Sequence, residues 1–187
     1  PEAVYLSTKI VVMSPSATNP PLTESGDYPN FFRTIARDDA QGLMAANFTI
    51  KKLGIKKAAV IHDKGDYGKG FAEFTKQFLE EGGAEVVLFE GVTPGAVDYS
   101  AVVQKVRQSG AEAVVFGGYH PEASKIVTAM RKKNMEIPFV SDDGVKDPTF
   151  IKVAGEFAEG VYATGPKDIS GNAMYEIALN DHKTKYN

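Results

Sequence analysis

The sequence predicts an α/β fold built on a parallel, doubly wound sheet, because apolar strands alternate with amphipathic helices along most of the chain. Short apolar runs bounded by turn residues predict five buried strands, at 58–61, 86–89, 113–116, 139–140 and 161–164. Apolar residues spaced three and four apart predict the helices around them, at 40–53, 71–81, 99–109, 122–132 and 149–157. Repeated βα units with right-handed crossovers give a parallel, Rossmann-like sheet.

Residues typical of helix ends support these boundaries. Asp98 stands directly before the helix predicted at 99–109, where it can accept hydrogen bonds from the first free amides as an N-cap. Gly54 and Gly110 follow two predicted helices, at positions where a left-handed backbone conformation favours glycine.

The two ends of the chain do not follow the alternation of strands and helices. Residues 1–9 resemble the remnant of a helix, and 10–13 read as a buried-type strand without a sequence neighbour to pair with. A loop rich in Pro, Ser, Thr and Asn spans 14–29, and 31–35 read as an extended segment. A further helix is predicted at 172–185. The lone strand ahead of a complete α/β unit indicates the trailing end of another domain.

The composition excludes several classes of function. The chain has 187 residues, a length that suits one α/β domain or one domain with part of another. Its net charge is −3 and its basic residues form no stripe, which argues against a nucleic-acid partner. The absence of cysteine excludes thiolate nucleophiles, iron–sulfur clusters and Cys-ligated zinc. No apolar run approaches the roughly 18 residues that a membrane span needs.

The loops after the predicted strands are the first place to look for a ligand site, because open α/β sheets bind ligands at the carboxyl ends of their strands. Tyr67 and Tyr119 lie in two of these loops, and Asp142 and Asp143 lie in a third. Aromatic faces and a carboxylate suit a small zwitterion or cation. The alternative for each tyrosine is a surface aromatic, and for one of the acids a turn or capping residue, since Asp before Gly is common in turns.

Two features that resemble enzyme motifs are weak. His62 and Asp63 at a strand end resemble a catalytic dyad, but no serine, threonine or lysine is placed beside them as a nucleophile. Gly65, Gly68 and Gly70 are spaced as Gly-x-x-Gly-x-Gly, which differs from both the dinucleotide fingerprint and the phosphate loop. No catalytic residue, metal ligand or cofactor is therefore expected.

Three segments together carry a resemblance to a known family. They are Ser-Pro-Ser-Ala-Thr-Asn-Pro-Pro-Leu-Thr at 14–23, the loop His-Asp-Lys through Tyr-Gly-Lys-Gly at 62–70, and Gly-Gly-Tyr-His-Pro-Glu at 117–122. In this order and spacing they resemble the bacterial periplasmic leucine/isoleucine/valine-binding proteins. The resemblance covers essentially the whole chain. Members of this family trap a ligand between two lobes and deliver it to the membrane permease of an ABC transporter.

The resemblance implies a division of the chain into four parts. Residues 1–30 correspond to the trailing end of the N-terminal lobe and 31–37 to a hinge crossing. Residues 38–165 correspond to the C-terminal α/β lobe of a type I periplasmic-binding-protein-like fold. Residues 166–187 correspond to a second hinge crossing and the start of a return segment. A periplasmic or other extracytoplasmic location follows from the family, although the chain contains no signal sequence of its own.

The resemblance also implies the roles of six residues, which surround an amino-acid ligand in the family. The loop that holds the ligand's carboxylate corresponds to Ser16, Ala17 and Thr18. Tyr67 and Tyr119 correspond to the aromatic residues that close over the ligand. Asp143 stands where several members carry the Glu that binds the α-ammonium. Because side chains alternate across a strand, Asp142 and Asp143 should point to opposite sides, and Gly144 provides the turn that leaves Asp143 at the open edge.

The expected function is therefore the capture of an amino acid, of the branched-chain type or related, with no catalysis. The alternative is the ligand-sensing domain of a receptor or transcriptional regulator, which has the same bilobal fold. A nucleotide-dependent enzyme is disfavoured by the glycine spacing. A complete sequence separates the first two, because a secretory signal favours transport and a helix-turn-helix favours regulation.

Overall fold

The computed structural model describes residues 7–186, and its main body is a parallel sheet of five strands in the order β4-β3-β5-β6-β7. These strands are β3 (Lys57–His62), β4 (Glu85–Gly91), β5 (Ala113–Gly117), β6 (Phe139–Ser141) and β7 (Val161–Ala163). All four pairings between neighbouring strands are parallel. The predicted fold class and all five predicted strands are confirmed.

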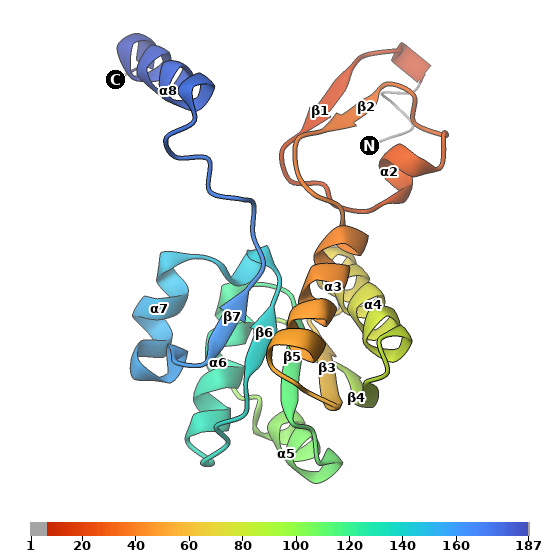
Figure 1. Cartoon of the computed structure of the whole chain (residues 1–187), viewed down its shortest axis with the longest axis vertical. Coiled ribbons are helices and arrows are strands. Elements are labelled where there is room, and N and C mark those ends of the chain that lie inside the picture. Colours follow the sequence, from red (N-terminus) through yellow and green to blue (C-terminus); the bar gives the residue numbers. More distant parts are fainter. Residues whose placement is uncertain (1–6, 187) are drawn as a thin grey trace.

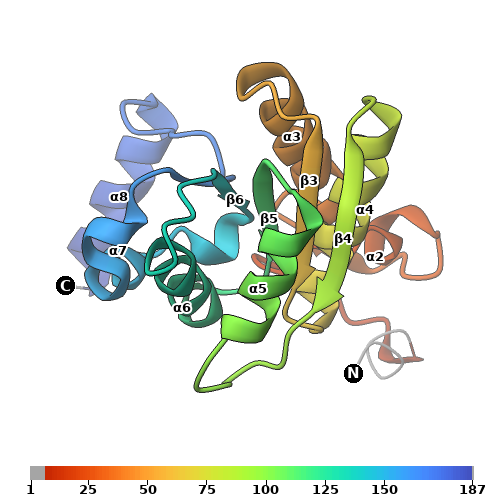
Figure 2. The same ribbon diagram turned by 90° about the horizontal axis from the view of Figure 1, so that it is seen from below.

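Helices cover both faces of the sheet and make a three-layer sandwich (Figures 1 and 2). One face carries α3 (Asp38–Asn47) and α4 (Asp66–Glu81). The other face carries α5 (Ser100–Ser109), α6 (His120–Arg131) and α7 (Pro148–Ala154). A π-helical turn, Phe48–Lys52, continues α3, and 3-10 turns occupy Asp143–Val145 and Gly155–Ala158.

The side chains of β3 alternate between the two faces of the sheet and pack into two separate hydrophobic cores. Ala59 and Ile61 point to the side of α5, α6 and α7, whereas Ala58 and Val60 point to the side of α3 and α4. All four side chains are fully buried. A strand that is buried on both faces reads as a continuous apolar run, which is the signal that predicted it.

The two glycines predicted at helix ends, Gly54 and Gly110, are confirmed by their positive φ values, whereas the N-cap position of α5 is Tyr99 and not Asp98. Asp98 Oδ1 accepts a hydrogen bond of 2.9 Å from the Ser100 amide at the start of α5, and Gly110 ends that helix with a φ of +70°. The predicted helix 71–81 begins at Asp66 instead. The glycines in this first turn carry no apolar side chain, so the spacing of apolar residues did not indicate that the helix begins there.

A smaller unit precedes the sheet in the chain. It contains β1 (Val12–Ser14), the short helix α2 (Pro21–Glu24) and β2 (Phe31–Arg33). The expectation of an unpartnered, buried strand at 10–13 is wrong on both counts. β1 pairs in parallel with β2, and the side chain of Met13 is 60% exposed. The extended segment predicted at 31–35 is confirmed by β2.

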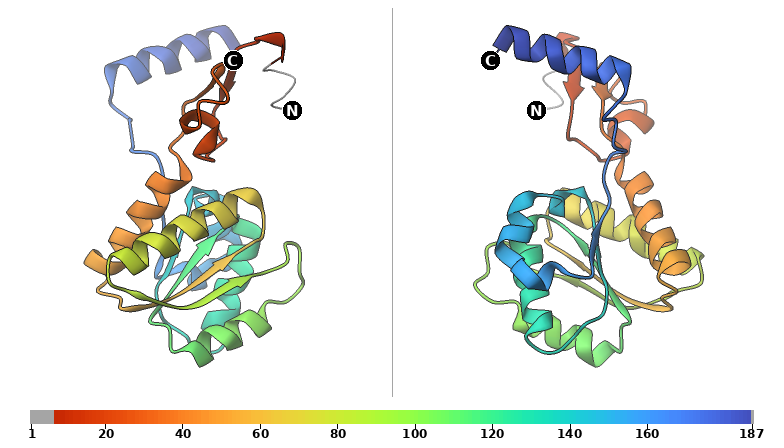
Figure 3. Two further views of the ribbon diagram at one scale, coloured as in Figure 1. Left: turned by 90° about the vertical axis from the view of Figure 1, so that its right-hand side faces the viewer. Right: turned by 60° about the vertical axis from the view of Figure 1, so that its left-hand side comes forward.

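The chain ends in α8 (Ala173–Tyr186), which confirms the helix predicted at 172–185. Both α8 and the small unit lie beyond the carboxyl ends of the strands, and thin connections link them to the sheet (Figure 3). The helix remnant predicted at 1–9 falls largely outside the described residues. Within residues 7–186, no helix combines the length and the apolar character that a membrane crossing requires.

Candidate functional site

The candidate site begins at the point where the strand order reverses. The chain leaves β3 towards β4 on one side and returns to β5 on the other, so the loops after β3 and β5 diverge at the carboxyl edge. Ligands of open α/β sheets bind at such a switch point. The two loops start in contact, because the Asp63 amide donates to the Gly117 carbonyl at 3.0 Å.

Glycine is required where these loops meet. A Cβ atom on Gly117 would lie 2.0 Å from the Gly68 carbonyl oxygen, and one on Gly68 would lie 2.4 Å from Asp63 Oδ1. The first turn of α4 therefore approaches the end of β5 backbone against backbone. This contact explains why residue 68 is glycine, although the spacing of the glycines does not match a phosphate-binding loop.

A cavity of about 240 Å³ opens above this edge, between the sheet and the small unit. Its size is below the range of roughly 300–1,000 Å³ that holds drug-sized ligands, so it suits a small solute. It is lined by Pro15, Ser16, Thr18, Ile35, Tyr67, Tyr119, Asp143 and Gly144. Five of the six residues predicted for the site thus line one cavity, although they come from segments separated by more than a hundred positions.

Ala17 is the predicted residue that does not line the cavity. Its amide donates to Ser14 Oγ at 2.9 Å, and its carbonyl accepts from the Arg33 guanidinium at 3.1 Å. Ala17 therefore lies behind the wall and shapes the loop that carries Ser16 and Thr18.

Tyr67 and Asp143 meet inside the cavity. The Tyr67 hydroxyl donates a hydrogen bond to Asp143 Oδ1. Burial, reinforced by the charges of Asp142 and Asp143, raises the pKa of Tyr67, so its phenol stays protonated and acts as a donor. Asp143 is half-buried and keeps its second carboxylate oxygen available to a further donor.

Tyr119 forms the outer part of the aromatic wall. Its ring centroid lies 5.5 Å from that of Tyr67 with an interplanar angle of 43°, a tilted contact typical of aromatic pairs. The residue is half exposed, at 50%, so its ring stands at the mouth of the cavity. A Cβ atom on Gly144 would lie 3.1 Å from this ring and 2.6 Å from the Gly118 carbonyl oxygen.

The two neighbouring acids point in different directions, as the alternation of side chains predicts. Asp142 is fully buried and accepts hydrogen bonds from the amides of Gly118, at 2.8 Å, and Gly144, at 3.1 Å. It joins the loops after β5 and β6, which is a structural task. Asp143, one residue later, lines the cavity.

Two charged residues that the sequence analysis missed stand behind the loop of Ser16 and Thr18. The Arg33 guanidinium donates to the carbonyls of Ala17 and Asn19 and to Thr23 Oγ1, with the last distance 2.6 Å. Asp38, the first residue of α3, is 2% exposed, and its amide donates to the Thr18 carbonyl at 3.0 Å. A charged residue at a strand end or helix start is common, so the sequence offered no signal for either role.

The residues that resembled a catalytic dyad are engaged in their own loop. His62 Nδ1 accepts from the Lys64 amide at 3.1 Å, and Asp63 Oδ1 accepts from the Gly65 amide at 2.8 Å. Burial lowers the pKa of His62, which favours the neutral ring, and this ring packs at 5.2 Å from that of Phe89. These contacts give both residues a structural role in the loop after β3.

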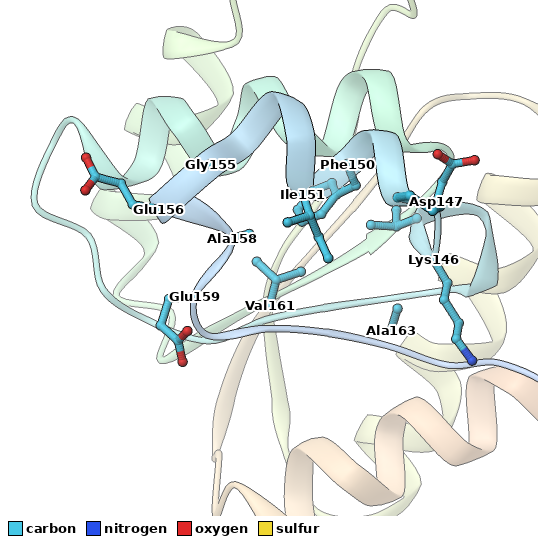
Figure 4. A pocket seen from close by; sticks show the side chains of 12 residues that line it. Lys146, Asp147, Phe150, Ile151, Gly155, Glu156, Ala158, Glu159, Val161 and Ala163 are labelled. Atoms are coloured by element: carbon cyan, nitrogen blue, oxygen red, sulfur yellow. The ribbon is translucent and has the colours of Figure 1, made fainter. Parts of the chain in front are cut away.

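A larger cavity, of about 710 Å³, lies between α7 and β7 and contains none of the predicted site residues (Figure 4). Its walls are mainly apolar, with Phe150, Ile151 and Val161 among them. The carboxylates of Glu156 and Glu159 point away from its centre (Figure 4). It therefore lacks the convergence of polar groups found in the smaller cavity. Within the described part of the chain, no group of His, Asp and Glu side chains is arranged to hold a metal ion.

Comparisons with known proteins identify the family of the chain. The model of the periplasmic binding protein family matches residues 2–174. The Leu/Ile/Val-binding protein homolog 1 of Brucella abortus (strain 2308) is 40% identical over 181 residues, which cover 95% of this chain and 48% of that protein. An amino acid binding protein of Pseudomonas aeruginosa is 44% identical over 163 residues, covering 86% of this chain and 43% of that protein. The chain spans about half the length of these curated relatives.

Solved structures give the same result. A leucine binding protein, LivK, of Thermotoga maritima matches 98% of this chain and 53% of its own with a TM-score of 0.87 and 26% identity. LivJ of Streptococcus pneumoniae, solved in complex with isoleucine, matches 99% of this chain and 53% of its own with a TM-score of 0.80 and 29% identity. These relatives are named for binding or transport and not for a reaction, which confirms the expectation of a binding protein that is not an enzyme. The chain belongs to the periplasmic binding protein family.

Proposed function

We propose that the complete protein is the extracytoplasmic solute-binding component of an ABC transporter and binds a branched-chain or related amino acid between two lobes. One observation carries this proposal. Ser16 and Thr18 from the small unit and Tyr67, Tyr119 and Asp143 from the sheet surround a single cavity. The names of the relatives, which refer to leucine, isoleucine and valine, support the choice of ligand.

The proposed lobes follow the two units of the chain. Residues 38–165 form one lobe, 1–30 are the trailing end of the other, and 31–37 are a hinge crossing between them. Residues 166–187 form a second crossing and the start of a return segment. The thin connections seen on both sides of the sheet unit support this division (Figure 3).

The chemistry of the cavity suits the two charges of an amino acid. The Asp143 carboxylate, oriented by the Tyr67 hydroxyl, is placed to accept from an α-ammonium. The hydroxyls of Ser16 and Thr18, which line the cavity, are the donors that this loop offers to the carboxylate, because the amides of Ser16 and Ala17 already donate to Ser14 Oγ. The rings of Tyr67 and Tyr119 give the apolar and cation–π contacts that enclose the ligand.

The test is the removal of one aromatic wall. In the complete protein, Tyr119→Ala should weaken binding of L-leucine by about tenfold or more, because an aromatic contact and its buried area are lost. The melting temperature should change little, since Tyr119 is 50% exposed. Calorimetric titration with L-leucine, L-isoleucine and L-valine measures the effect.

A matched control is Tyr162→Ala on β7. Tyr162 is 40% exposed and packs against Phe48 on the far side of the fold, outside the cavity. This variant should bind as tightly as the wild type. Equal affinities for the wild type and the Tyr119 variant would contradict the assignment of Tyr119, and a wild-type protein that binds none of the three amino acids would contradict the proposed function.

A further inference from the structure

The small unit and the sheet unit are joined by an ionic contact as well as by the chain itself. Arg37 lies directly before α3 and donates from Nε and Nη2 to the two carboxylate oxygens of Asp39, at 2.9 Å each. Its remaining nitrogen, Nη1, forms an ion pair with Glu24 Oε1 at the end of α2. One guanidinium therefore contacts a carboxylate on each side of the junction.

The ion pair of Arg37 with Glu24 differs from the others in its position. All other ion pairs among residues 7–186 lie on the sheet side of the junction, for example Lys76 with Glu80 on α4 at 3.0 Å. The bidentate contact with Asp39 fixes the plane of the guanidinium, so its third nitrogen is already directed at Glu24. An arginine that is ordered in this way loses less side-chain entropy when it binds a second carboxylate.

The main chain that connects the units at this junction is short. The small unit ends its ladder where the Thr34 amide donates to the Ser14 carbonyl at 3.1 Å, and α3 begins at Asp38. Residues 35–37 join these two points. The side chain of Arg37 crosses the same gap to reach the small unit, so it restricts how that unit can turn about the connection, where hinge motion is absorbed by a few loop residues.

The far partner of this ion pair is linked to the wall of the candidate cavity. Glu24 is the last residue of α2, and its Oε1 accepts from Thr23 Oγ1 at 3.3 Å. Arg33 donates both to Thr23 Oγ1 and to carbonyls of the loop after β1, so the loop and α2 are held together. That loop carries Ser16 and Thr18, which line the cavity. A displacement of Glu24 therefore displaces the cavity wall.

We propose that Arg37 is a positioning residue for ligand binding, which holds the small unit against α3 and so keeps the loop of Ser16 and Thr18 over the cavity. This role rests on the proposed function and deepens it. The contact acts through charge, because both partners of the guanidinium are carboxylates. The side chains of Arg37, Glu24 and Asp39 are 36%, 54% and 27% exposed, so dissolved salt reaches and screens them. The affinity for the ligand should therefore depend on ionic strength through this contact.

The experiment measures the dissociation constant of the complete protein for L-leucine in about 20 mM and in about 500 mM NaCl. Glu24→Gln keeps the shape of the side chain and removes its charge, so it should bind about two- to fivefold more weakly than the wild type at the lower salt concentration. The two proteins should bind alike at the higher concentration, where the wild-type contact is screened. Arg37→Gln should show the same loss, and the double variant should lose no more than either single variant, because one contact is shared.

A charge reversal and a matched control complete the set. Glu24→Arg replaces attraction with repulsion, so it should bind more weakly than Glu24→Gln at the lower salt concentration and should recover as salt is added. Glu80→Gln is the control, because Glu80 pairs with Lys76 at a similar exposure but within α4. It should keep the wild-type affinity at both salt concentrations. The melting temperatures of the ligand-free variants should stay close to that of the wild type.

The role of Arg37 is overturned if the wild type and Glu24→Gln bind L-leucine equally at the lower salt concentration, or if the ratio of their dissociation constants does not change with salt. It is also overturned if Glu80→Gln shows the same loss, or if the Glu24 variants lose thermal stability and keep their affinity. A wild-type protein that binds none of L-leucine, L-isoleucine and L-valine would instead overturn the proposed function itself.

Discussion

Replacing Asp143 with Asn removes the negative charge that we assign to the ligand's ammonium while keeping the shape of the side chain. The amide oxygen of Asn can still accept from the Tyr67 hydroxyl, which now bonds to Asp143 Oδ1. The second oxygen becomes an NH₂ group, which repels an ammonium instead of accepting from it. The change therefore acts on the ligand and leaves the contact within the protein in place.

The size of the effect follows from the kind of bond that is lost. A hydrogen bond to a charged group contributes about 1.5–3 kcal/mol, which corresponds to about 10- to 150-fold in affinity. Asp143→Asn should weaken L-leucine binding by this factor in calorimetric titrations of the complete protein at pH 7.5. The melting temperature should stay close to that of the wild type, because the side chain is half-buried and remains bonded to Tyr67.

The neighbouring acid supplies the matched control. Both carboxylate oxygens of Asp142 accept from backbone amides, those of Gly118 and Gly144, and Asn offers one acceptor where two are needed. Asp142→Asn should therefore cost about 1–3 kcal/mol of folding free energy, seen as a lower melting temperature, with a much smaller loss of affinity per folded molecule. If the two variants lose affinity equally, or if the Asp143 variant loses stability and keeps its affinity, the assignment of Asp143 is refuted.

Two further substitutions test the frame of the site. Gly68→Ala should reduce the free energy of unfolding by about 1–3 kcal/mol, because its Cβ would lie 2.5 Å from the Gly117 carbonyl oxygen. The loss is measured as a lower urea midpoint, and an unchanged midpoint would show that the loops can separate without cost. Arg33→Lys keeps the charge but cannot reproduce the fork that reaches Ala17, Asn19 and Thr23, so L-leucine binding should weaken about tenfold. An unchanged affinity for L-leucine would show that the loop keeps its shape without this fork.

The strands and most helices could be predicted because their signals are local. Residues 58–61 form an unbroken apolar run, and the structure buries them on both faces of β3. The start of α4 could not be predicted in the same way. Its first turn contains Gly68, which is present because of a contact with Gly117, about fifty positions away. The spacing of apolar residues within a short stretch of sequence does not reveal that a residue must be glycine because of a contact with a distant strand.

The residues of the candidate site also divide into those that a local sequence signal predicts and those that depend on contacts between distant segments. Tyr67, Tyr119 and Asp143 could be predicted because the carboxyl edge of a parallel sheet collects the loops after its strands. Asp38 could not, because its significance depends on burial and on the approach of Thr18 from a different unit. The error at 10–13 has a similar origin. An apolar strand reads as buried, but β1 has β2 as its sheet neighbour and keeps Met13 exposed.

The close glycine contacts at the carboxyl edge constrain how the ligand range of this protein can be redesigned. Where Gly68 meets Gly117, and where Gly144 meets Gly118, main chain packs against main chain at the carboxyl edge, and a side chain at these positions would force the loops apart. An engineer who builds a biosensor on this scaffold should therefore leave these glycines unchanged. Variation belongs at Ile35 on the opposite wall, where a side chain can change size without a change in the sheet.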